Sequence, residues 1–225
     1  MNLISTEHGQ SLQLFVPEEV RPLSGLYLPD LIQKISERYA FAIGPQNYNS
    51  AIKEGVKYKE GRFVAQGRLI SIKDLGFFND GVLVSVASNT DDSELVLTDL
   101  VAWAIQNFGI REPETKLPRK FFSSVVVQFD IELGRTLTFF DEIRQDFSSS
   151  IKNAYGIEPE VNASRIGLSA DPTRLPPQTT FEFTIERRVG RPFEENRYFS
   201  AAPLPTASHV DLLVGFERRL LRKRH

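Results

Sequence analysis

Three acidic side chains follow an apolar run within the stretch FNDGVLVSVASNTDDSELVLTDLVAWAI, residues 78–105. They are Asp91, Asp92 and Glu94. Asp91 and Glu94 have the spacing of a capping box, in which two side chains bind the free backbone N–H groups at the start of a helix. Carboxylates in a first turn also interact favourably with the helix dipole. A hard cation such as Mg²⁺ would need further carboxylates from other segments. The pattern therefore favours a helix cap over a metal or acid–base site.

A second pair of carboxylates lies on the strand predicted for residues 121–133. Asp130 and Glu132 are two positions apart, so on a strand they point to the same side, as carboxylates that share a proton or a metal must. A solvent-exposed strand end is the favoured interpretation. If the ends of the two strands lay side by side, Asp91, Asp92, Asp130 and Glu132 would together suit a metal-dependent hydrolase or nuclease.

Basic and aromatic side chains alternate in the polar segment 51–63. A nucleic-acid contact there would use Lys53, Lys57, Tyr58, Lys59 and Arg62. Lysine and arginine neutralise phosphates, and an aromatic ring stacks on a base. The alternative is a solvated loop whose aromatic rings return to the core.

A second basic region closes the chain in the sequence ERRLLRKRH. Its cations are Arg218, Arg219, Arg222, Lys223 and Arg224. Cations at the end of a helix complement the negative end of its dipole, which explains them without a ligand. A positive tail also suits nucleic acid, an acidic protein or an anionic membrane surface.

Other catalytic signatures are missing from the sequence. The chain has no cysteine and three histidines, so disulfides, thiolate nucleophiles and thiolate metal sites are excluded. It contains no Gly-rich phosphate loop, no G-x-G-x-x-G, no H-E-x-x-H and no G-x-S-x-G elbow. We therefore expect no cofactor, and the sequence favours a protein that is not an enzyme.

The elements that must position these residues follow from hydrophobic periodicity. Helices are predicted from Leu28, from residues 91–108, from Thr138 to a stop at Gly156, and over His209–Arg222. Strands are predicted at 62–72, 81–88, 121–133 and 179–188, with a hairpin turn at Asn79–Gly81.

The composition is that of an ordinary globular chain. Of 225 residues, 41% are hydrophobic and 25% charged, with a formal net charge of -2. The start MNLISTEHGQ lacks the basic and apolar regions of a secretory signal, and no run approaches the roughly 20 apolar residues of a membrane span. The expected location is the cytoplasm.

The predicted fold is α+β, with mixed or antiparallel sheets covered by amphipathic helices. Two similar halves, 1–108 and 121–225, are expected on either side of a linker at 109–120 that is rich in proline and charge. The long apolar strand 121–133 would invite pairing with another chain if it lay at a sheet edge. The leading hypothesis is a non-enzymatic interaction or assembly subunit that binds a protein partner or itself as a homo-oligomer. Nucleic-acid binding is the first alternative, and the metal-dependent hydrolase or nuclease is the second.

Overall fold

The structure, a computed structural model, describes residues 1–23, 25–45, 55–113, 115, 117–137, 140–175 and 181–222. Its strands are β1 (Asn2–Leu14), β2 (Val56–Ala65), β3 (Arg68–Phe78), β4 (Gly81–Val86), β5 (Arg119–Gln128), β6 (Arg165–Ser169), β7 (Glu182–Arg187) and β8 (Arg197–Ala202). Its helices are α1 (Pro17–Val20), α2 (Leu28–Arg38), α4 (Thr90–Phe108), α5 (Leu133–Thr136), α6 (Asp141–Tyr155) and α7 (Thr206–Arg222), with 3-10 turns η2 (Pro172–Arg174) and η3 (Phe193–Glu195). The predicted mixture of α and β structure is confirmed.

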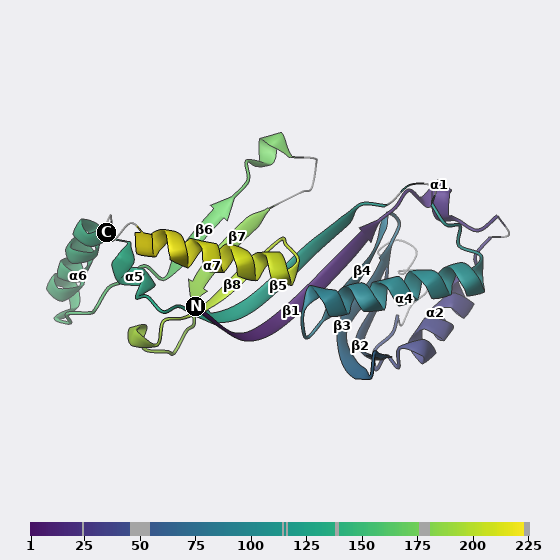
Figure 1. The fold of residues 1–225 in the computed structure, drawn as a ribbon, viewed down its shortest axis with the longest axis horizontal. Helices are drawn as coiled ribbons and strands as arrows, with labels where there is room; N and C mark the ends of the chain where they lie inside the picture. The colour runs from purple at the N-terminus through teal and green to yellow at the C-terminus, as the bar shows by residue number, and fades with distance from the viewer. Residues whose placement is uncertain are drawn as a thin grey trace. The chain divides into compact units, whose positions relative to one another are not determined.

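The described strands join in one eight-stranded antiparallel sheet, with the order β2-β3-β4-β1-β5-β8-β7-β6 (Figure 1). The predicted turn at Asn79–Gly81 connects β3 to β4, with Phe78 opposite Gly81. The strand predicted at 121–133 is β5, which ends at Gln128 and lies between β1 and β8. It is therefore an inner strand, and the two edges of the sheet are β2 and β6.

The chain forms two compact units. The larger unit comprises Thr6–Ser124 and Pro203–Ala207, and the smaller unit comprises Met1–Ser5, Val125–Ala202 and Ser208–His225. Strands β1 and β5 contribute residues to both. The predicted division at 109–120, and the similarity of two halves, stay predictions.

The single strand predicted at 62–72 is wrong. Residues Gln66 and Gly67 form a tight turn at its centre, both with positive φ, and they separate β2 from β3. Glycine adopts this left-handed conformation without steric cost, which makes Gly67 the residue that permits the turn. Ala65 pairs with Arg68 across it, so β2 and β3 form a long antiparallel hairpin.

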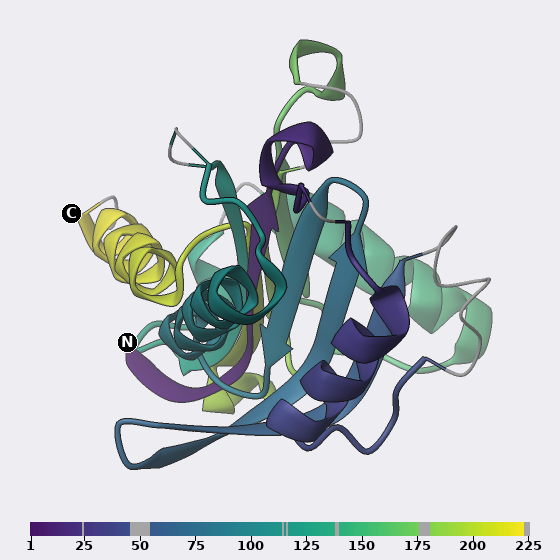
Figure 2. The ribbon, with the colours of Figure 1, turned by 90° about the vertical axis from the view of Figure 1, so that its right-hand side faces the viewer.

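The core of the larger unit lies between its strands and the helices α2 and α4. Both helices lie on the same side of strands β2 to β4 (Figure 2). Apolar side chains of α2 and α4 share one buried cluster with the inward residues of β2, β3 and β4. The predicted helical pattern from Leu28 is confirmed, and Ile35 is fully buried.

The start of α4 differs from the predicted capping box. Asn89 is the N-cap, and its side chain accepts a hydrogen bond of 2.9 Å from the backbone N–H of Asp92. The helix begins at Thr90, so Asp91 lies inside the first turn and is exposed. Glu94 forms an ion pair with Arg119 instead of reaching back to the cap. Asp91 and Asp92 lie in the first turn, where their carboxylates interact favourably with the positive end of the helix dipole.

The smaller unit has its own buried cluster, to which β5, β7, β8 and α7 contribute. Helix α7 starts at Thr206, earlier than the predicted His209, and packs Leu213 into this cluster. The predicted stop of α6 at Gly156 is confirmed, with φ of 71°. The apolar stripe of α6 is not buried, since Ile143 and Phe147 remain 63% and 56% exposed.

The first strand was not predicted from the sequence. β1 is 13 residues long, and its inward side in the larger unit carries Gly9, Ser11 and Gln13, all buried. A Cβ on Gly9 would lie 2.2 Å from the backbone carbon of Asn89, so glycine lets β1 approach the start of α4. Ser11 shares a 2.7 Å hydrogen bond with Ser93 of α4. The buried side of β1 is therefore polar, whereas the alternating pattern that predicts a strand has apolar residues on the buried side.

Candidate functional site

The basic residues predicted in segment 51–63 lie on β2. Lys57, Lys59 and Arg62 are exposed, and none forms an ion pair with a described residue. Tyr58 is fully buried, and its hydroxyl donates to the backbone oxygen of Ile32 at 3.1 Å. Its ring is therefore not available to stack on a base. Lys53 lies outside the described residues.

The basic C-terminal region is the exposed end of α7. Arg218, Arg219 and Arg222 are exposed, and the last two occupy the final turn, where they complement the helix dipole. Lys223 and Arg224 lie outside the described residues.

Asp92 has protein partners that account for its carboxylate. Its side chain is 8% exposed, with one oxygen 2.8 Å from Arg68 Nη2 and the other accepting from Ser88 Oγ at 2.7 Å. A positive charge and a hydroxyl thus satisfy both oxygens, as buried charges require. Asp92 connects the start of α4 to the β2–β3 turn and needs no metal ion.

The other predicted carboxylate pair is in the smaller unit. Asp130 is exposed and forms an ion pair with the amino group of Met1, while its backbone N–H donates to Glu217 Oε1 at 2.7 Å. Glu132 is half-buried and precedes α5. In the described part of the chain, no group of three or more His, Asp or Glu side chains is placed to hold a metal ion. These residues thus provide no support for the metal-dependent hydrolase or nuclease.

A buried serine–histidine pair occupies the core of the smaller unit. His209 Nε2 lies 2.9 Å from Ser200 Oγ, and both residues are completely buried. The Ser200 hydroxyl donates to the backbone oxygen of Thr184 at 2.6 Å, so it is oriented into the sheet. Burial lowers the pKa of His209 to about 4, because the charged imidazolium would lose its hydration. The pair is a structural contact without access for a substrate.

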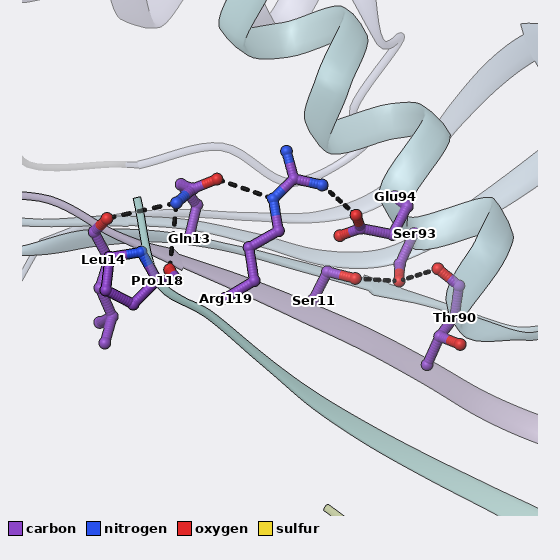
Figure 3. Close-up of polar contacts among 8 residues, drawn as sticks. All are labelled: Ser11, Gln13, Leu14, Thr90, Ser93, Glu94, Pro118 and Arg119. Carbon is purple, nitrogen blue, oxygen red and sulfur yellow. Dashed lines mark hydrogen bonds and ion pairs between the residues drawn. The ribbon is translucent and has the colours of Figure 1, made fainter. Parts of the chain in front are cut away.

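A polar cluster that the sequence did not reveal joins β1, β5 and α4 in the larger unit. Arg119 Nε donates to Gln13 Oε1 at 2.8 Å, and Arg119 Nη1 forms an ion pair with Glu94 (Figure 3). Gln13 also donates to the backbone oxygen of Pro118 at 3.1 Å. These three side chains line a cavity of about 1540 Å³, whose other walls are largely apolar. Of these three residues, the sequence pattern indicates only Glu94, and it indicates a helix cap there.

The two edges of the sheet differ in what covers them. Along β2, Lys59 exchanges backbone hydrogen bonds with Ile43, and the N–H of Arg62 donates to Tyr39. No described segment pairs with the outer side of β6. Leu168 on β6 is 64% exposed. β6 therefore presents an open strand edge with an apolar side chain beside it.

Comparisons with protein-family models and with curated proteins find no match for this chain. Among the described residues, no helix has the length and apolar character needed to cross a bilayer.

Proposed function

We propose that the protein is a non-enzymatic assembly subunit that self-associates through the outer edge of β6. The observation that carries this proposal is the direction of the β6 backbone groups. Arg187 N–H donates to Ser164 oxygen at 2.8 Å, and Ala170 N–H donates to Phe181 oxygen at 3.0 Å. Hydrogen-bonded and non-bonded positions alternate along an antiparallel pair. The backbone groups of Arg165, Gly167 and Ser169 therefore point away from β7.

A second copy of the same strand fits this edge. If two β6 strands pair antiparallel about Gly167, each Arg165 faces Ser169 of the partner and each Ile166 faces Leu168 of the partner. No like charges then lie opposite each other, and the apolar side chains meet on one face. Gly167 lies at the two-fold axis without a side chain, and the contact is isologous, as in most dimers. An unpaired edge favours this kind of strand addition.

The expected association is weak. One pair of short strands buries less than the roughly 1200 Å² of total surface that marks the lower end of stable interfaces. We therefore expect a weak dimer in exchange with the monomer. Catalysis has no part in this proposal.

The test is a proline at the centre of the proposed contact. Gly167→Pro removes an outward N–H and leaves the β6–β7 hydrogen bonds intact, and proline is tolerated on edge strands. Gly167→Ala is the matched control, because its Cβ would meet only Glu182 Oε1, at 3.8 Å. Analytical ultracentrifugation across a dilution series should show a dimer for the native protein and for Gly167→Ala, and a monomer for Gly167→Pro. A native protein that is monomeric at every concentration, or a dimer that persists in Gly167→Pro, would contradict the proposal. Circular dichroism establishes that each variant is folded.

Nucleic-acid binding is retained as a second candidate because of the exposed cations of β2. Lys57, Lys59 and Arg62 project from the same edge strand, and none of them forms an ion pair with a described carboxylate. Phosphate contacts predict an affinity that falls steeply as salt rises. Binding of a mixed-sequence oligonucleotide at low salt should be lost in Lys57→Glu/Lys59→Glu and kept in Lys152→Glu, an exposed lysine of the smaller unit. Undetectable binding of the native protein at low salt would exclude this candidate.

A further inference from the structure

A cavity with a wide apolar wall lies entirely within the larger unit. Its volume is about 1540 Å³, and its apolar walls come from α2, α4 and strands β3 and β4. Representative lining residues are Leu31, Ile35, Phe77, Val82, Leu100 and Ala104. Ligand pockets typically measure about 300–1000 Å³ and combine apolar walls with a few convergent polar groups. This cavity therefore has room for a long apolar chain.

The polar groups of the cavity are Gln13, Glu94 and Arg119. Gln13 is 7% exposed, and its amide is oriented by the backbone oxygen of Pro118. No described residue accepts a hydrogen bond from Arg119 Nη2, which Figure 3 draws without a contact. Glu94 Oε1 is buried and has no hydrogen-bond partner. The polar part of the wall thus carries one donor and one acceptor without a described partner.

An unsatisfied buried oxygen costs free energy unless a ligand or water donates to it. A ligand that satisfies both groups must donate to Glu94 Oε1 and accept from Arg119 Nη2. A hydroxyl group or a primary amide does both. Arg119 and Glu94 neutralise each other, so their combined field does not favour a charged head group.

We propose that this cavity binds an amphiphile with an unbranched alkyl chain and an uncharged head group that both donates and accepts hydrogen bonds. The alkyl chain occupies the apolar part between α2 and α4. The head group lies at Glu94 and Arg119. A carboxylate head would face the Glu94 carboxylate, and an ammonium head would face the Arg119 guanidinium.

Entry to the cavity is from solvent, past α1 and the segment after α4. Exposed residues Glu18, Arg21 and Glu112 are part of its lining. Arg111 holds these segments together, since its Nε donates to the backbone oxygen of Arg21 at 2.9 Å and its N–H donates to Val20 at 3.0 Å. Because exposed residues are part of the lining, a ligand can enter without unfolding of the core.

The first test compares three probes with the same alkyl chain, namely decanol, decanoate and decylammonium. Isothermal titration calorimetry of the full chain should show saturable binding of decanol at one site. Decanoate and decylammonium should bind about tenfold more weakly, because each loses one hydrogen bond to a charged group and meets a like charge. Equal affinities for the three probes, or no binding of decanol, would overturn the proposal.

The second test uses variants that separate the apolar walls from the head-group site. Ala104→Phe narrows the cavity and should abolish decanol binding, whereas Ala102→Phe, on the exposed side of the same helix, should leave it unchanged. Glu94→Gln removes the negative charge while keeping the shape, so decanoate should bind more tightly than decanol to this variant. Retained decanol binding in Ala104→Phe would place the ligand elsewhere, and an unchanged head-group preference in Glu94→Gln would contradict the assigned polar site.

Discussion

Protonation of His209 should destabilise the protein as the pH falls below neutrality. His209 is completely buried, and its Nε2 lies 2.9 Å from Ser200 Oγ. Burial lowers its pKa from 6.5 to about 4. The unfolded chain therefore binds more protons than the folded chain between these two values, and stability increases with pH through this range. The contribution is fully present above pH 6.5 and is lost as the pH falls towards 4.

The expected magnitude follows from the difference in pKa. Each pKa unit corresponds to about 1.4 kcal/mol, so a change from neutrality to about pH 5 should cost about 2 kcal/mol from this residue alone. Carboxylates that titrate at lower pH add their own contributions. The His209→Gln variant removes the imidazole and keeps a polar side chain beside Ser200. A constant loss of stability in the variant does not matter, because only the change with pH is compared.

Urea unfolding at about pH 7 and about pH 5, followed by circular dichroism, measures this change. The native protein should lose about 2 kcal/mol more than His209→Gln over this range. His8→Gln is the control for the other described histidine, whose pKa is lowered by burial and then by Lys73. The reasoning is refuted if native protein and His209→Gln show the same pH dependence within about 0.5 kcal/mol, which is smaller than half of one pKa unit.

Two further substitutions test the packing of the larger unit, and the single tryptophan of this unit reports its unfolding. Gly9→Ala should destabilise the larger unit by about 2 kcal/mol, because the new Cβ would collide with the Asn89 backbone. Gly44→Ala is the control and should have little effect, because the atom nearest to its new Cβ lies 3.7 Å away. Equal stabilities of the two variants would show that β1 and α4 are not so close. Tyr39→Phe should cost about 2 kcal/mol, because the buried hydroxyl donates to Asp99 Oδ2 at 2.6 Å. A stability loss below about 0.5 kcal/mol in Tyr39→Phe, seen in the urea midpoint of tryptophan fluorescence, would mean that this hydrogen bond contributes little.

Two of the predicted site residues show why sequence patterns could not identify the surroundings of a functional site. The alternation of cations and aromatics in segment 51–63 left open whether Tyr58 stacks on a base or returns to the core, and the structure buries its ring in the core. An aromatic residue looks the same in the sequence whether its ring packs in a core or contacts a ligand. Only its neighbours, here the backbone of Ile32, decide which it is. The same holds for Glu94, whose partner Arg119 is distant in sequence.

The sequence was sufficient to predict elements that depend only on neighbouring residues. The spacing of apolar residues predicted α4 and α2, and glycine at the stop positions ended α4 at Gly109 and α6 at Gly156, both in the left-handed conformation. The absence of cysteine excluded thiolate chemistry outright. Helix periodicity and left-handed glycine stops depend on a few neighbouring residues, so one sequence is enough to find them.

Tertiary structure alone decided the features that depend on distant pairs. β1 has a buried side of Gly9, Ser11 and Gln13, whose polar side chains form hydrogen bonds with Ser93 and Arg119. The order of the strands made β5 an inner strand and left β6 at the edge, although β5 has the stronger apolar pattern. A strand can exchange its backbone hydrogen bonds with any other strand, so its partners are selected by the packing of the whole sheet rather than by its own residues.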